Sequence, residues 1–182
     1  MNFLVTGVAG FIGFHLVKAL AKKNNKIIGI DNINTYYDVS LKKNRLKILK
    51  NTENFTFLKL DIQDKKLYSK LKNEKIDCAI NLAAQAGVRH SFKDPHSYIN
   101  SNVLGHLNVM EIVKKKNIKK FIYASSSSVY GGNQKTPFSV LDRVDSPLSL
   151  YAASKKSCEM ITECYANLFK INCVGLRFFT VY

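Results

Sequence analysis

Three glycines near the N-terminus restrict the possible folds of this chain more than any other feature. Gly7, Gly10 and Gly13 have the spacing G-x-x-G-x-x-G, directly after the apolar run Asn2–Thr6 and directly before a helical apolar pattern. Glycine permits a tight strand-to-helix turn and a close approach of the backbone to a pyrophosphate, and the free N–H groups of the helix N-terminus attract that anion. The flanking strand and helix make the three glycines informative. The pattern predicts a phosphate-binding turn.

Short apolar runs alternate with helical patterns along the whole chain. In the helical patterns apolar residues recur every three or four positions, as at Ile12, Leu16 and Leu20. Strands that alternate with helices indicate βαβ units with right-handed crossovers and a parallel sheet covered on both faces. We therefore expect an α/β fold with a doubly wound parallel sheet. The expected strands are Asn2–Thr6, Lys26–Ile30, Thr56–Lys59, Cys78–Asn81, Lys120–Ala124 and Asn172–Arg177.

The length of the chain suits one globular domain. It has 182 residues, of which 46% are hydrophobic and 23% charged. No apolar stretch approaches the ~18 residues of a membrane span, and no secretory leader precedes the first strand. We therefore expect a cytoplasmic protein without a membrane partner. Because the sequence ends at Tyr182, directly after an expected strand, we expect residues 1–182 to be one domain of a longer protein.

The basic composition raises the question of a nucleic-acid partner. The formal net charge is +15, but the basic residues form short runs such as Lys22-Lys23, Lys42-Lys43 and Lys114-Lys115-Lys116. These runs fall on the polar side or at the end of expected helices, and no aromatic residues are interleaved with them. We therefore expect solvated faces and no nucleic-acid binding, although a basic surface can steer an anionic substrate. The four cysteines and four histidines lack metal-ligand spacing, so we expect no metal.

A carboxylate follows the second expected strand. Asp31 lies 18 positions after Gly13, close to the ~20 expected for the residue that binds the ribose hydroxyls of a dinucleotide. A carboxylate repels a 2′-phosphate, so the position favours NAD over NADP. Asn32 and Asn34 could add hydrogen bonds to the ribose, and Asp61, after the third strand, could meet adenine. The long connections Asp31–Ser40 and Tyr130–Leu150 are typical of segments that line a site.

Tyr151 and Lys155 supply a candidate acid–base pair. Their spacing places both side chains on one face of an expected helix. An adjacent ammonium favours the phenolate, so we expect the pKa of Tyr151 to be lowered toward neutrality, which would let it exchange a proton with a hydroxyl. The serine run Ser125–Ser128 ends the fifth expected strand, where ligands bind in open α/β sheets.

Together these segments resemble the extended short-chain dehydrogenase/reductase family, and within it the NAD-dependent epimerases and dehydratases. The resemblance spans the whole chain and is closest to UDP-glucuronate 4-epimerases. It rests on Gly7–Gly13, Asp31–Arg45, Asp61-Ile62, Asn81–Ser91, Ser125–Gly131, Tyr151–Lys155 and Leu176–Tyr182. Relatives often have His at the position of Asn81. They also continue past the equivalent of Tyr182 into a C-terminal domain that grips the nucleotide, so we expect that substrate domain to be largely missing here.

The resemblance implies a Rossmann fold and a role for each matching residue. The implied catalytic residues are Ser126, Tyr151 and Lys155. The implied cofactor-binding residues are Gly7, Gly10, Phe11, Ile12, Gly13, Asp31, Asn32, Asn34, Asp61, Ile62, Leu82, Ala83, Ala84, Gln85, Asn102, Tyr151, Lys155 and Phe178. The implied substrate residues are Arg89, Ser126, Ser127, Ser128, Tyr151 and Thr180.

The function implied is NAD-dependent epimerisation of a nucleotide sugar at carbon 4 through a transient 4-keto sugar, from UDP-glucuronate to UDP-galacturonate. The full-length enzyme is expected to be a homodimer. The alternatives are a dehydratase or decarboxylase of the same family, or a non-catalytic, truncated NAD-binding module. A dehydratase usually has an Asp-Glu pair after its catalytic threonine, and a decarboxylase commonly has Glu before Val-Tyr. Ser127 and Ser128 occupy those positions here, which favours the epimerase.

Overall fold

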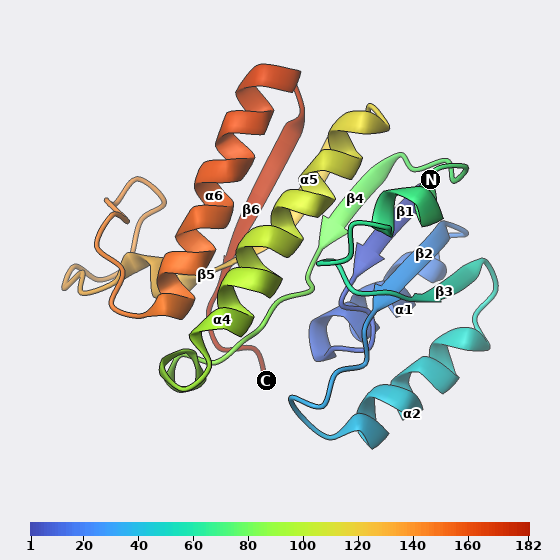
Figure 1. The fold of residues 1–182 in the computed structure, drawn as a ribbon, viewed down its shortest axis with the longest axis horizontal. Helices are drawn as coiled ribbons and strands as arrows, with labels where there is room; N and C mark the ends of the chain where they lie inside the picture. Colours follow the sequence, from blue (N-terminus) through green and yellow to red (C-terminus); the bar gives the residue numbers. More distant parts are fainter.

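Six strands form a single parallel sheet in the computed structural model, which describes all 182 residues. Their order across the sheet is β3-β2-β1-β4-β5-β6 (Figure 1). The strands are β1 (Asn2–Thr6), β2 (Lys26–Asp31), β3 (Phe55–Lys59), β4 (Cys78–Asn81), β5 (Lys120–Ser126) and β6 (Asn172–Phe178). All six expected strands are present, and no boundary differs from the expected one by more than two residues.

Helices cover both faces of the sheet, as expected for a doubly wound fold. The α-helices are α1 (Phe11–Ala21), α2 (Val39–Lys50), α3 (Leu67–Leu71), α4 (Pro95–Tyr98), α5 (Gly105–Lys115) and α6 (Leu150–Phe169). The 3₁₀ segments η1 (Arg89–Phe92) and η3 (Ser127–Tyr130) and the π-helical segment η2 (Ile99–Leu104) complete the list. No helix has both the length and the apolar character needed to cross a bilayer.

Two apolar clusters divide the core between the faces of the sheet. On one face, side chains of α1 and α2, including Phe14 and Leu46, pack against β1, β2 and β4. On the other, side chains of α3, α5 and α6, including Leu67, Met110 and Cys158, pack against the same sheet. From β1 to β3, each new strand is added toward one edge of the sheet, and the connecting helices α1 and α2 lie on one face. The chain then returns to the centre, where β4 lies beside β1, and the later helices lie on the other face. The connections that follow β1 and β4 therefore leave on opposite faces, which opens a crevice at the carboxyl ends of these strands, the usual ligand position in such folds.

A buried chain of hydrogen bonds beneath this crevice connects β1 and β4 to α5 and α6. Thr6 Oγ1 donates to Asn81 Oδ1 at 2.6 Å, and Asn81 Nδ2 donates to His106 Nδ1 at 3.1 Å. His106 therefore carries its proton on Nε2, which donates to Thr162 Oγ1 at 2.8 Å. Thr6 Oγ1 also accepts the backbone N–H groups of the two residues after β4, at 3.1 and 3.0 Å. Every partner is satisfied, so the chain fixes the segment after β4 without an uncompensated buried group.

Burial of His106 predicts a specific loss of stability in acid. Burial, with a smaller contribution from the charge of Lys155, lowers the pKa of His106 to about 3. Between this value and about 6.5 the unfolded chain binds a proton that the native protein does not, so the free energy of unfolding falls as the pH drops. We expect His106 to account for a loss of about 2 kcal/mol between pH 7 and pH 5. Urea unfolding at both pH values measures it.

The matched variants are His106→Gln and His15→Gln, since His15 is exposed. The difference in unfolding free energy between the two pH values should shrink in His106→Gln and persist in His15→Gln. An unchanged difference in His106→Gln would show that another group causes the acid sensitivity.

Candidate active site

Two adjoining cavities form one cleft at the carboxyl ends of the strands. The first has a volume of about 240 Å³ and the second about 580 Å³. Their combined size suits a cofactor or small-molecule ligand. The residues that line both are Gly7, Gly10, Tyr37, Leu82, Ala84 and Ala86. The cleft is therefore continuous past the glycine turn, with β2 and β3 on the side of the first cavity and β5 and β6 on the side of the second.

The glycine turn has no room for side chains. Gly7 has φ +73°, and a Cβ there would stand 2.8 Å from the backbone nitrogen of Ala83. A Cβ on Gly13 would collide with the carbonyl oxygen of Gly7. No side chain caps α1, which begins after Gly10 and whose first residues line the second cavity, Phe11 and Ile12 among them. Its free N–H groups and positive dipole end therefore suit an anion such as a pyrophosphate.

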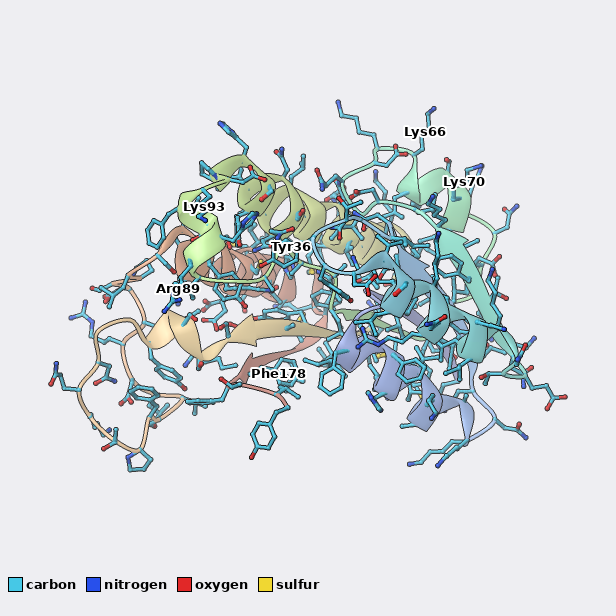
Figure 2. The ribbon with its side chains drawn as sticks, turned by 90° about the horizontal axis from the view of Figure 1, so that it is seen from below. Tyr36, Lys66, Lys70, Arg89, Lys93 and Phe178 are labelled. Atoms are coloured by element: carbon cyan, nitrogen blue, oxygen red, sulfur yellow. The ribbon has the colours of Figure 1, made fainter.

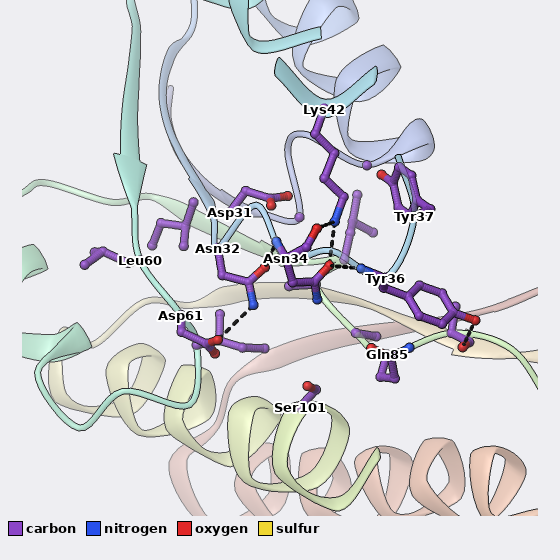
Figure 3. A pocket seen from close by; sticks show the side chains of 18 residues that line it. Asp31, Asn32, Asn34, Tyr36, Tyr37, Lys42, Leu60, Asp61, Gln85 and Ser101 are labelled. Carbon is purple, nitrogen blue, oxygen red and sulfur yellow. Dashed lines mark hydrogen bonds between the residues drawn. The ribbon is translucent and has the colours of Figure 1, made fainter. Parts of the chain in front are cut away.

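The first cavity has a carboxylate and amides on its wall (Figure 3). Asp31 is 9% exposed, and its two oxygens accept the backbone N–H groups of Ala9 at 3.0 Å and Ile33 at 2.8 Å. Asn32 Nδ2 donates to Asp61 Oδ2 at 2.8 Å. A carboxylate has acceptor capacity for about four hydrogen bonds, so Asp31 can still accept from ribose hydroxyls. Asn34, Ile62 and the segment Leu82–Gln85 complete this part of the wall.

Lys42 differs from its expected position on the solvated side of a helix. It is only 4% exposed and lines the first cavity, where its Nζ donates to the carbonyl oxygen of Asn34 at 2.8 Å. Its ammonium also lies 4.3 Å from the centre of the Tyr37 ring. The expectation was wrong because the segment between β2 and α2 folds back over α2. Burial lowers the pKa of Lys42, while the charge of Asp31 acts in the opposite direction.

Tyr36 and Arg45 also reach the cleft, although no sequence pattern had indicated either of them. Tyr36 Oη donates to the carbonyl oxygen of Ala86 at 2.8 Å, which joins the segment after β2 to the segment after β4 (Figure 3). Arg45 Nη1 donates to the carbonyl oxygen of Ala9 at 3.2 Å and lines the second cavity. The unusual length of the loop Asp31–Ser40 was the available signal, but it did not indicate which side chains would point inward.

Asn102 lies behind the wall rather than on it. Its Oδ1 accepts the backbone N–H of Gln85 at 2.7 Å, and its Nδ2 donates to the carbonyl oxygen of Gln85 at 3.0 Å and to Ser154 Oγ at 2.9 Å. It borders neither cavity, so the structure gives it the task of holding Gln85 instead of the expected cofactor contact. Gln85 itself lines the first cavity, and its side chain lies beside the hydroxyl of Tyr98.

The three expected catalytic residues meet in the second cavity. Lys155 is 4% exposed, and its Nζ donates to the carbonyl oxygen of Ala124 at 3.0 Å and lies 6.0 Å from the ring centre of Tyr151. Ser126 ends β5, and its Oγ accepts the backbone N–H of Ser128 at 3.1 Å. Ser127, Ser128, Phe178 and Thr180 line the same cavity. Ser126, Tyr151 and Lys155 thus line one cavity, as the sequence patterns predicted that they would lie close together.

The protonation of Tyr151 differs from the expectation. Burial raises the pKa of Tyr151, and a hydrogen bond with Ser126 opposes the shift without cancelling it. Burial also lowers the pKa of Lys155. The prediction that the ammonium would move the pKa of Tyr151 toward neutrality is thus wrong, because both groups lose hydration in the same pocket. With a raised pKa, the Tyr151 hydroxyl can donate a proton.

Arg89 is outside the cleft. It is exposed at the start of η1 and borders neither cavity. Figure 2 shows Arg89 and Lys93 on the η1 side of the molecule and Lys66 and Lys70 on the opposite side, while Phe178 lies at the lower edge between them. The expected substrate contact of Arg89 therefore has no support from its position, and the labelled basic side chains belong to separate surfaces.

The fold and the cleft define a class of protein. A doubly wound sheet, a tight glycine turn, a carboxylate after β2 and a Ser-Tyr-Lys set beside the turn are typical of short-chain dehydrogenases/reductases of the extended type. The sequence model of the family described as GDP-mannose 4,6 dehydratase matches residues 4–182. The chain belongs to this family of NAD-dependent epimerases and dehydratases.

Several proteins are similar to the whole chain. Protein CapI of Staphylococcus aureus is 51% identical over 183 residues, which cover 100% of this chain and 54% of CapI. UDP-glucuronate 4-epimerase 1 of Arabidopsis thaliana is 46% identical, and the match covers 100% of this chain and 43% of that protein. The crystal structure of UDP-glucuronic acid 4-epimerase from Bacillus cereus, in complex with UDP-glucuronic acid and NAD, is 38% identical with a TM-score of 0.91, covering 100% of this chain and 57% of that one. The chain spans about half the length of the curated relatives it matches.

The packing of the glycine turn predicts the effect of adding one methyl group. In a helix, alanine is intrinsically favoured over glycine by ~1 kcal/mol, but at position 13 its Cβ would collide with the Gly7 carbonyl. We expect Gly13→Ala to lower the free energy of unfolding by about 1–3 kcal/mol. Gly132→Ala is the control, because the nearest atom to its Cβ would be Leu148 Cδ1 at 3.7 Å. Chemical denaturation of the two variants measures both effects, and equal stabilities would contradict the packing argument.

Proposed function

We propose that this chain is the NAD-binding domain of an enzyme that epimerises a UDP-hexuronate at carbon 4, interconverting UDP-glucuronate and UDP-galacturonate. The observation that carries the proposal is the arrangement of Ser126, Tyr151 and Lys155 around the cavity next to the glycine turn. The similarity to UDP-glucuronate 4-epimerases supports it over the whole chain. The full-length protein is proposed to be a homodimer that binds the sugar nucleotide with a second domain.

The residues of the cleft fit NAD. The first cavity would hold the adenosine, with Asp31 and Asn32 at the ribose and Asp61 and Ile62 near the adenine. The turn at Gly7 and the uncapped N-terminus of α1 would hold the pyrophosphate. Gln85 lines the first cavity, and Phe178 lines the second, where the nicotinamide would lie. NAD, when bound, accepts a hydride from the sugar and returns it, and its cationic nicotinamide favours the phenolate form of an adjacent tyrosine.

Tyr151 would transfer the proton of the carbon-4 hydroxyl. It takes this proton when the hydroxyl is oxidised and returns it when the 4-keto sugar is reduced on its other face. Lys155 keeps a positive charge next to the phenolate, and Ser126 donates a hydrogen bond to the reacting oxygen. Burial raises the pKa of Tyr151, so a positive charge beside its ring would favour the phenolate that this step needs.

The side chains around the reacting atoms favour epimerisation over the other reactions of the family. Ser127, Ser128 and Thr180 are neutral donors in the second cavity and can accept the carboxylate of a uronic acid without repulsion. Elimination of water by a dehydratase would need carboxyl groups where Ser127 and Ser128 stand. No carboxylate lines the second cavity.

Product analysis of the full-length gene product tests the proposal. With NAD and UDP-glucuronate we expect UDP-galacturonate, formed faster than UDP-glucose is epimerised at the same concentration. Tyr151→Phe should bind NAD normally but turn over ~10²–10⁴ times more slowly, as for loss of a general acid–base group. Tyr165→Phe, on the same helix but bonded to Glu111, is the control and should keep its activity. A 4-keto-6-deoxy product, carbon dioxide, faster use of UDP-glucose or no turnover at all would exclude the proposed reaction.

Cofactor preference tests the role of Asp31. We expect the protein to bind NAD more tightly than NADP, because the carboxylate repels a 2′-phosphate. Asp31→Asn removes the charge and keeps one of the two oxygens that accept backbone N–H groups, and should reduce the ratio of affinities by roughly tenfold, equivalent to ~1.4 kcal/mol. Asp77→Asn removes the same charge where Asp77 binds the backbone of Asn2, at the amino end of β1, and should leave the ratio unchanged. Calorimetric titration with both nucleotides gives the ratios, and equal affinities in the unaltered protein would refute the assignment.

A further inference from the structure

The helix that carries Tyr151 is tied to β5 at two successive turns. Tyr151, Lys155 and Glu159 are four residues apart, so they lie on the same face of α6. Lys155 Nζ donates to the carbonyl oxygen of Ala124, and Glu159 Oε1 accepts from Ser125 Oγ at 2.6 Å. Two consecutive residues of β5, directly before Ser126, therefore hold two consecutive turns of the helix.

Arg177 completes the second of these ties from β6. Ser125 and Arg177 are partners in the register of β5 with β6. The guanidinium donates from Nε to Glu159 Oε1 at 2.9 Å and from Nη2 to Oε2 at 3.1 Å, and the two side chains are only 19% and 12% exposed. Burial acts to raise the pKa of Glu159, but the hydrogen bonds from Arg177 and Ser125 outweigh it and the pKa is lowered. The carboxylate is thus held ionised with fixed geometry, unlike a flexible surface ion pair.

Arg177 also supports the segment that follows Ser126. Its guanidinium lies 5.0 Å from the ring centre of Tyr130, the last residue of η3, and its Nη1 donates to the carbonyl oxygen of Val140 at 3.4 Å. Ser126 begins η3 as its N-cap, with its Oγ accepting from Ser128. One carboxylate therefore connects the helix of Tyr151, the strand of Ser126 and the turn of Ser127 and Ser128.

We propose that Glu159, acting through Ser125 and Arg177, is a positioning residue that sets α6 against β5 and so places Tyr151 relative to Ser126. The proposal rests on the proposed function. Lys155 alone would tie α6 to β5 at one point, because Ser154, Thr162 and Tyr165 bond the helix to η2 and α5 instead. Glu159 adds a second point on β5, one turn away and about 6 Å along the axis, on the face that carries Tyr151. Misplacement of reacting groups by about 1 Å can slow a reaction ~10²-fold.

An isosteric pair of variants at position 125 isolates the tie. Ser125→Thr keeps a hydroxyl for Glu159, whereas Ser125→Val has the same shape without it, and both add the same methyl group. In the chain of 182 residues labelled with ¹³Cζ-tyrosine, the resonance of Tyr151 is assigned by its loss in Tyr151→Phe. We expect this resonance to differ between the Val and Thr variants, and that of the Thr variant to match the unaltered protein. An identical Tyr151 resonance in the two would overturn the proposal.

Glu159→Gln and Glu111→Gln form the second comparison. Like Glu159, Glu111 accepts a hydrogen bond from a hydroxyl at 2.6 Å, in this case from Tyr165. It also pairs with lysines, but it lies on α5, outside the cleft. Glu159→Gln should move the Tyr151 resonance, and Glu111→Gln should move only that of Tyr165. If both variants lose the same stability and neither moves the Tyr151 resonance, Glu159 is a structural ion pair only.

Kinetics of the full-length gene product add a readout that a general loss of stability does not give. We expect kcat of Ser125→Val to be about 10–100-fold below that of Ser125→Thr, with similar KM and similar NAD affinity. Equal kcat values would overturn the positioning role. If the unaltered full-length protein does not epimerise any sugar nucleotide, the proposed function fails, while the tyrosine resonances still decide whether Glu159 places Tyr151.

Discussion

The contact between Gly7 and the backbone of Ala83 is the constraint on which the cleft depends. It brings the end of β1 against the segment after β4, at the place where the crossovers part to opposite faces of the sheet. Gly7 also donates its N–H to the carbonyl oxygen of Ile30 at 2.7 Å, which adds the end of β2. Three strands therefore meet at this turn. A side chain at position 7 would collide with the backbone after β4, so both cavities border the bare backbone of Gly7, and α1 is directed with its N-terminus toward the cleft.

The segment after β4 is held from three directions, which explains why it can serve as a wall. Thr6 accepts the N–H groups of its first residues from beneath. Asn102 holds both backbone groups of Gln85 from η2, and Tyr36 donates to the carbonyl oxygen of Ala86 from the segment after β2. Both backbone groups of Gln85 are thus satisfied, and its side chain lines the first cavity. The wall therefore keeps its shape without an unpaired backbone group.

Local patterns in the sequence were sufficient for the sheet, the glycine turn and the Ser-Tyr-Lys set, because each depends on residues close together in the chain or on strand ends that a parallel sheet collects. The placements that the patterns did not predict have a different origin. Lys42 looks like a surface lysine in a helix, and its burial depends on how the loop before it folds back. Asn102 is in a π-helical turn, Ile99–Leu104, and the extra residue of such a turn changes which side chains face inward. Arg89 is close to the wall in sequence but exposed at the start of η1. Each of these placements results from tertiary packing, which the local periodicity of apolar residues does not indicate.

The pKa values of Tyr151 and Lys155 show that spacing is also insufficient to predict electrostatics. From spacing alone, an ammonium four residues from a phenol must favour the phenolate, but spacing does not tell how much hydration the pair loses. In the folded protein Lys155 is almost completely buried and the pKa of both groups shifts toward the neutral form. The Lys155 charge is partly compensated by the carbonyl oxygen of Ala124 instead of by a phenolate. A positive charge placed beside Tyr151 would attract the phenolate without adding hydration. The burial that raises the pKa of Tyr151 also strengthens such an attraction, because electrostatic interactions are stronger where water is excluded.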